Sequence, residues 1–132
     1  MIDKENYNEE AMFPPILAVD FDGTLVENKF PEIGAIRETM WNAVKAYQAI
    51  GWKIILWTCR TDDMLDDAVK FCKMNDLVPD AVNENLPEVK AVYGGDTRKV
   101  FANMYIDDRN AALFGEEGFA PYVLEVSNGV GV

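Results

Sequence analysis

Short apolar runs alternate with amphipathic and polar segments along most of the chain. Residues 16–21 and 53–58 are apolar runs of strand length with little alternation, as expected of strands that are covered on both faces. Residues 79–83, 104–106 and 122–126 have the character of three further short strands. The pattern therefore predicts five strands.

Two amphipathic helices are expected between these strands. Residues 34–50 carry apolar side chains at helical spacing and are followed by a glycine, a typical helix end. Residues 61–75 have an apolar face and begin with threonine and aspartates, which favour a helix N-terminus. A short helical segment is expected at 111–114, while residues 23–34 and 84–99 are rich in turn formers and are expected to be loops.

The order of these elements indicates the fold class. Strands that alternate with helices are typical of an α/β domain with a parallel sheet. The length of 132 residues suits one domain, expected at residues 16–132, with residues 1–15 as a polar lead-in. No apolar run is long enough to span a membrane, and the N-terminus does not resemble a signal peptide, so a cytoplasmic protein without membrane contact is expected.

Composition narrows the chemistry. The chain has no histidine, which excludes Ser-His-Asp and Cys-His sites as well as histidine-ligated zinc. Acids outnumber bases by 23 to 12, and the formal net charge is -11. Carboxylate oxygens suit hard cations such as Mg²⁺. The same charge argues against nonspecific nucleic-acid binding, although acidity also serves solubility.

Polar groups follow three of the predicted strands at their carboxyl ends. Ligands of parallel sheets bind beyond these ends, so we expect the groups to converge at one edge of the sheet. Several carboxylates in one small volume repel each other unless a cation lies between them, and a bound Mg²⁺ is therefore expected. The groups are Asp20 and Asp22, Thr58 and Arg60, and Asp107 and Asp108.

Such a site suits the hydrolysis of a phosphate ester. A carboxylate beside Mg²⁺ and basic groups can attack phosphorus and form an aspartyl-phosphate. A second acid two residues further on can protonate the leaving oxygen and then deprotonate water. Gly23 permits the bend that would place the two acids on either side of the phosphorus.

The run DFDGT at residues 20–24, directly after an apolar strand, resembles the DxDGT signature of the haloacid dehalogenase-like (HAD) hydrolase superfamily. The resemblance covers about residues 16–126. It implies a Rossmann-like three-layer α/β/α sandwich with a five-stranded parallel sheet in the order 5-4-1-2-3 and no cap domain, because both insertion points are short. The resulting open site would serve a large substrate or be closed by a neighbouring subunit of a homo-oligomer.

The resemblance also implies roles for the residues of the first two motifs. Asp20 would be the nucleophile and a Mg²⁺ ligand. Asp22 would be the general acid and base, with its backbone carbonyl on the metal. Gly23 and Thr24 would contact the substrate phosphate, and Thr58 would donate a hydrogen bond to a phosphoryl oxygen. The implied reaction is hydrolysis of a phosphomonoester carried by a small molecule or a macromolecule.

The remaining site residues come from later segments. By the same resemblance, Asp107 would bind Mg²⁺ directly or through water, with Asp108 beside it. A lysine is expected in the third motif. Lys99 is preferred to Lys90 because it lies closer in sequence to the acids, and a solvated surface charge is the alternative for either residue.

Arg60 offers a second resemblance, to the phosphatase domain of phage polynucleotide kinase, which carries an arginine at the corresponding place. Its forked guanidinium would bind the substrate phosphate, or would pair with Asp62, Asp63 or Asp108. A polynucleotide 3′-phosphatase is therefore an alternative function. A noncatalytic HAD-like domain that binds a phosphorylated partner is another, although such proteins usually lose an aspartate of the first motif.

Overall fold

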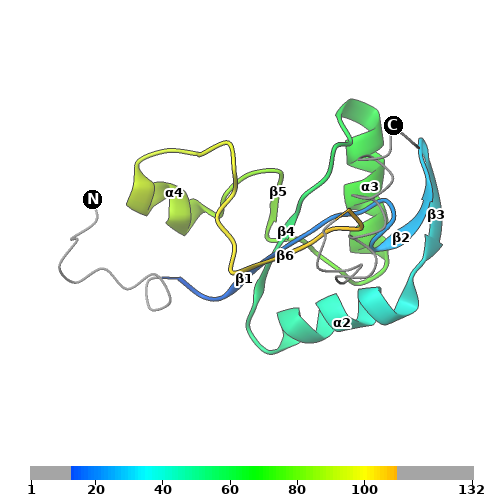
Figure 1. Cartoon of the computed structure of the whole chain (residues 1–132), viewed down its shortest axis with the longest axis horizontal. Coiled ribbons are helices and arrows are strands. Elements are labelled where there is room, and N and C mark those ends of the chain that lie inside the picture. Colours follow the sequence, from blue (N-terminus) through cyan, green and yellow to red (C-terminus); the bar gives the residue numbers. More distant parts are fainter. Residues whose placement is uncertain (1–12, 110–132) are drawn as a thin grey trace, which may run out of the picture.

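The structure is a computed structural model of the chain, and it describes residues 13–109. Within this range it is a mixed α/β fold with a parallel sheet of four strands, an antiparallel pair of strands and three helices (Figure 1). β1 lies inside the sheet, between β4 and β6, in the order β5-β4-β1-β6. The strands are β1 (Ile16–Val19), β4 (Lys53–Leu56), β5 (Ala81–Val82) and β6 (Met104–Ile106).

These strands are four of the five predicted from the sequence. β1, β4, β5 and β6 correspond to the predicted strands 1, 2, 3 and 4. Their order agrees with the part 4-1-2-3 of the expected order 5-4-1-2-3. The expected fifth strand at 122–126 and the helical segment at 111–114 lie outside the described residues. β1 is buried at every position, which explains why its sequence lacks alternation.

Helices cover both faces of the sheet. α2 (Glu38–Ala49) and α3 (Asp62–Met74) contribute Trp41, Val44, Ala68 and Cys72 to an apolar cluster with Leu17 and Val19 of β1. α4 (Pro87–Tyr93) contributes Val89 to a second cluster, which contains Ile16 and Ala18. Figure 1 shows α4 on the opposite side of the strands from α2 and α3.

The expected start of the first helix and the expected loop at 23–34 are wrong. α2 begins only at Glu38, and the preceding residues form a hairpin of β2 (Val26–Lys29) and β3 (Glu32–Ile36). A Cβ at Gly34 would lie 2.1 Å from the carbonyl oxygen of Glu27, so the two hairpin strands approach too closely for any other residue there. The pairing of β2 with β3 therefore overrides the helical spacing of the apolar residues at the start of the predicted helix.

The expected loop at 84–99 is also partly wrong, because residues 87–93 form α4. Pro87 occupies the first turn, and Gly94 ends the helix in the left-handed conformation with φ of 77°. Proline at the start and glycine just past the end are a known helix signature. Between β1 and α2, and between β5 and β6, the described chain contains only the hairpin, α4 and loops.

Packing includes part of the expected lead-in. Phe13 is buried, and its ring centroid lies 5.5 Å from that of Phe101. The backbone N–H of Lys53 donates to the carbonyl of Pro15 at 2.8 Å and so extends the pairing of β1 with β4. None of the helices in the described range combines the length and apolar character that a membrane crossing requires.

Candidate functional site

Three carboxylates meet at the carboxyl ends of β1 and β6. Val19 pairs with Ile106 across the two parallel strands, so the residues that follow, Asp20 and Asp107, lie side by side. The N–H of Asp20 donates to the carbonyl of Ile106 at 2.9 Å. One carboxylate oxygen each from Asp20, Asp107 and Asp108 lies within 4.8 Å of the other two. We call these three residues the acidic triad.

Burial and repulsion perturb the acidic triad. Burial raises the pKa of Asp20 from 3.8 to about 7, and the neighbouring charge of Asp107 contributes in the same direction. Burial also raises the pKa of Asp108, together with a hydrogen bond and charge repulsion from Asp107, while Arg109 opposes this shift. The carboxylate oxygens of the acidic triad converge, and their ionisation is unfavourable without a positive charge nearby. Such oxygens match the donor set of a hard cation such as Mg²⁺.

The turn after β1 holds Asp20 in place. The carbonyl of Phe21 accepts hydrogen bonds from the N–H groups of Thr24 and Leu25, at 3.2 and 2.9 Å. The hydroxyl of Thr24, which is buried, donates to Oδ2 of Asp20 at 3.3 Å. Thr24 thus contacts the carboxylate of Asp20, and its expected contact with the substrate phosphate stays a prediction.

Gly23 links this turn to the acidic triad. Its φ is +84°, in the left-handed region that favours glycine. A Cβ at Gly23 would lie 2.3 Å from Oδ2 of Asp108, so a side chain here would push this carboxylate away. Gly23 therefore makes room for a member of the acidic triad.

Asp22 and Arg60 form a bidentate ion pair. Nε and Nη2 of Arg60 each donate to one carboxylate oxygen of Asp22 at 2.7 Å. The other N–H groups of Arg60 donate to the carbonyls of Pro31 (3.1 Å), Glu32 (2.8 Å) and Met64 (3.4 Å). All five N–H groups of the guanidinium are thus used within the protein. The ion-pair partner is Asp22, and not Asp62, Asp63 or Asp108, while the expected contact of Arg60 with a substrate phosphate stays a prediction.

Thr58 lies just beyond β4, at the same edge of the sheet. Its N–H donates to Oδ1 of Asn83 at 2.8 Å, and its hydroxyl oxygen accepts from the N–H of Arg60 at 3.2 Å. These bonds shape the turn that carries Arg60 toward Asp22. Cys59 between them is exposed.

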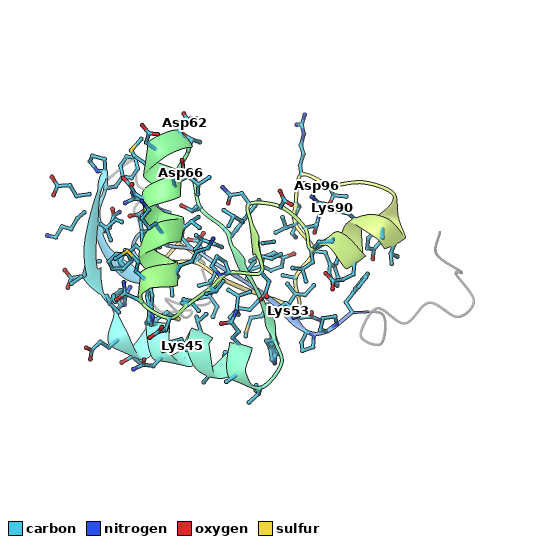
Figure 2. The ribbon with its side chains drawn as sticks, turned by 180° about the vertical axis from the view of Figure 1, so that it is seen from behind. Lys45, Lys53, Asp62, Asp66, Lys90 and Asp96 are labelled. Atoms are coloured by element: carbon cyan, nitrogen blue, oxygen red, sulfur yellow. The ribbon has the colours of Figure 1, made fainter. Side chains whose placement is uncertain are left out.

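The structure does not bring either candidate lysine into contact with the acidic triad. Nζ of Lys99 lies 5.3 Å from the ring centroid of Tyr105. Lys90 pairs with Glu84 at 2.8 Å and lies near Asp96 (Figure 2). Within residues 13–109, neither lysine forms an ion pair with an aspartate of the acidic triad.

Asn85, which the sequence analysis did not single out, organises the loop that carries Lys99. Its side chain is buried, and its Nδ2 donates to Oδ1 of Asp96 at 2.8 Å and to the hydroxyl of Thr97 at 3.1 Å. Its Oδ1 accepts from the N–H of Phe101 at 2.6 Å. The only sequence signal was a polar residue soon after a predicted strand, which is common in loops.

Arg37 is a second residue that the sequence did not indicate. Its Nη1 donates to the carbonyl of Gly23, so a cation lies against the turn after β1. Arg37 directly precedes α2. Because residues 34–50 were expected to form one helix, no feature of the pattern separated Arg37 from an ordinary surface arginine.

Comparison with known proteins adds a relative. No protein-family model matches the chain, and no curated protein sequence matches it either. A solved structure, that of a conserved protein coded by a locus of Bacteroides thetaiotaomicron, is similar, with 33% sequence identity and a TM-score of 0.67. The match covers 85% of this chain and 90% of that protein. The chain therefore belongs to the same family as this conserved Bacteroides thetaiotaomicron protein.

Proposed function

We propose that the protein is a Mg²⁺-dependent phosphomonoesterase of the HAD-like superfamily that acts through an aspartyl-phosphate on Asp20. The observation that supports this most directly is the acidic triad, which gathers Asp20 with Asp107 and Asp108 at the carboxyl ends of neighbouring parallel strands. The DFDGT run at residues 20–24 adds the second acid and the glycine that such chemistry needs.

The proposal includes the complete fold of that superfamily. It would be a Rossmann-like three-layer sandwich whose fifth strand continues the sheet beyond β6. The strand order would be 5-4-1-2-3, in which strands 1 to 4 are β1, β4, β5 and β6. The four described strands and the helices on both faces are compatible with it. No cap domain is inserted in residues 13–109, so the site would accept a large phosphorylated substrate or be closed by a second copy of the chain.

The metal would be held by the acidic triad, together with the backbone carbonyl of Asp22. When bound, Mg²⁺ supplies positive charge that favours the ionised form of Asp20 and neutralises the substrate phosphate. The chemistry of the donor set supports this assignment, because three carboxylate oxygens within 4.8 Å of each other suit a hard cation.

The residues of the chain would carry out two displacements at phosphorus. In the first, a carboxylate oxygen of Asp20 bonds to phosphorus, the bond to the leaving oxygen breaks, and Asp22 gives that oxygen a proton. In the second, Asp22 takes a proton from water as the water oxygen bonds to phosphorus. The bond from phosphorus to Asp20 then breaks, and inorganic phosphate leaves with Asp20 restored.

Other groups would orient the phosphate. Thr58 uses its hydroxyl oxygen as an acceptor for the N–H of Arg60, which leaves its O–H to donate to a phosphoryl oxygen. The N–H groups of Arg60 are fully engaged, so we assign the cationic contacts to Lys99, Arg37 and Arg109. Arg37 contacts the turn at Gly23, and Arg109 lowers the pKa of Asp108, so both lie beside the acidic triad.

Hydrolysis of para-nitrophenyl phosphate with and without Mg²⁺ tests the proposal. We expect metal-dependent turnover by the wild type and a loss of at least about 10³-fold in Asp20→Asn, because the nucleophile is removed. Asp66→Asn is the matched control, because it makes the same chemical change at an exposed position of α3 (Figure 2), a helix that contributes no residue to the acidic triad.

Turnover that survives in Asp20→Asn, or that does not respond to Mg²⁺, would contradict this mechanism. A wild-type protein that binds Mg²⁺ but hydrolyses neither this ester nor a panel of phosphorylated sugars, nucleotides and 3′-phosphorylated oligonucleotides would instead favour a noncatalytic domain that binds a phosphorylated partner.

A further inference from the structure

Among the described residues, Arg60 is the one buried residue with a charged side chain, and its relative exposure is 2%. Burying a guanidinium is costly unless it is paired and its N–H groups are satisfied. Arg60 meets both conditions, but only by drawing on three separate parts of the chain. These are the turn after β1, the β2–β3 hairpin and the first turn of α3.

At its base the hairpin is anchored by Val26, which is buried in the core, and by Ile33 and Ile36, which pack against it. Its far end, residues 27–32, is exposed, so little apolar area fixes that end. At its turn, the carbonyls of Pro31 and Glu32 both accept from Arg60. The ring of Phe30, itself 53% exposed, lies over the guanidinium at 5.2 Å. The guanidinium thus holds the end of the hairpin.

The same guanidinium determines the direction of the carboxylate of Asp22. Two parallel N–H···O bonds of 2.7 Å fix both the position and the plane of the carboxylate, which a single bond would not do. Each carboxylate oxygen keeps a further lone pair. The side chain of Asp22 is 15% exposed, so water or a substrate can still reach it.

We infer that Arg60 is a positioning residue that couples the β2–β3 hairpin to Asp22, so that the position of the hairpin and the orientation of the Asp22 carboxylate depend on each other. The catalytic consequence rests on the proposed function, because it assumes that Asp22 transfers the proton. The physical coupling between hairpin and carboxylate does not depend on that assumption.

The leaving group of the substrate separates positioning from mere stability. An alkyl phosphate has a poorly acidic leaving alcohol and needs the proton that Asp22 provides, whereas para-nitrophenolate leaves without one. A loss of alignment at Asp22 should therefore lower kcat/KM, which reports on the first displacement, selectively for alkyl phosphates. A loss of folded protein would slow both substrates by the same factor.

The first arm measures kcat and KM for an alkyl phosphate and for para-nitrophenyl phosphate, with Mg²⁺, in Arg60→Lys and Phe30→Ala. For Arg60→Lys we expect kcat/KM to fall by about 10²-fold on the alkyl phosphate and by only a few-fold on the aryl phosphate, because kcat/KM reports on the first displacement alone. We expect kcat to fall for both substrates, since Asp22 also deprotonates the water of the second displacement. Phe30 is largely exposed, so Phe30→Ala keeps the fold and should give the same selectivity at a smaller amplitude. Equal losses of kcat/KM on both substrates would overturn the positioning role.

The second arm measures hydrogen exchange of the amides of residues 26–36, without any substrate. We expect faster exchange in both Arg60→Lys and Asp22→Asn, because either change removes the paired charge-assisted bonds. Asp62→Asn is the matched control, since Asp62 is exposed, near Arg60 in sequence and not bonded to it. Unchanged exchange in the hairpin of both variants would overturn the coupling.

The two arms also separate this inference from the proposed function. A wild type that hydrolyses no phosphate ester refutes the phosphatase proposal, and the exchange arm still decides whether Arg60 couples the hairpin to Asp22. Selective loss on alkyl phosphates together with a loosened hairpin supports both.

Discussion

At the scale of single residues, Gly23 meets two separate requirements at once. Its φ of +84° calls for a residue without a Cβ, and the carboxylate of Asp108 occupies the place where that Cβ would lie. Gly94 offers a useful contrast. It has a similar φ of +77°, but no atom lies within 4 Å of a Cβ built there. Substituting each of the two glycines by alanine therefore separates the effect of backbone strain from the effect of displacing a residue of the acidic triad.

We predict that Gly23→Ala lowers stability and weakens Mg²⁺ binding, whereas Gly94→Ala lowers stability alone. The backbone term should be about 1 kcal/mol in each case, because alanine is strained at positive φ. Only the alanine at Gly23 would also push Asp108 out of the acidic triad. Urea unfolding measures the first effect, and calorimetric titration with Mg²⁺ measures the second. Equal Mg²⁺ affinities in the two variants would show that Gly23 does not make room for a ligand.

At the scale of elements, the long and strongly patterned segments were predictable. The buried runs of β1 and β4 and the helix α3 follow from apolar pattern and length. The hairpin was not predictable, because it depends on the close approach of Gly34 to Glu27 and on contacts of its turn with Arg60. α4 had a Pro and Gly signature, but its short length and polar flanks resembled a loop.

The candidate site divides in the same way. Asp20, Asp107 and Asp108 could be predicted together because parallel strands bring their carboxyl ends to one edge. The pair of Arg60 with Asp22 could not, since the two residues are 38 positions apart and several nearer aspartates compete in the sequence. Asn85 was missed for a similar reason, because its partners lie 11 and 16 residues further along the chain.

We predict that Asn85→Ala destabilises the protein by about 1–3 kcal/mol, because the buried side chain of Asn85 makes hydrogen bonds to Asp96, Thr97 and Phe101 that the alanine would lose. The loop that carries Lys99 should also exchange its amides faster, while Mg²⁺ affinity stays unchanged, since the acidic triad comes from other elements. Chemical unfolding and hydrogen exchange measure these effects. Asn42→Ala, at an exposed position of α2, is the control and should alter neither.

At the scale of the whole molecule, the acidic triad makes stability depend on pH and on cations. The pKa of Asp20 is about 7 in the folded protein and 3.8 when unperturbed, so the folded state binds more protons between these values. The free energy of unfolding contributed by this group therefore falls as pH rises through that window. The raised pKa of Asp108 acts in the same direction.

We predict that the Tm of the metal-free protein falls between about pH 4 and pH 7, and that it falls less in Asp20→Asn, which lacks this titration. The net charge of -11 also lowers stability at high pH, but it affects both proteins nearly alike, so the difference between them isolates Asp20. Mg²⁺ at about pH 8 should raise the Tm of the wild type more than that of the variant. Parallel curves for the two proteins would contradict the raised pKa.

The central place of β1 has a consequence for the order in which the molecule is made. β1 leaves the ribosome before β4 and β6 and can pair with β4 once α2 has formed, but its other edge stays open until residues 104–106 appear. Until then, Asp20 has no acidic neighbours from β6. The crowding of charge, and with it any affinity for a cation, therefore arises only after β6 has been made. A newborn chain can thus build most of its core before it has to accommodate the repulsion within its own site.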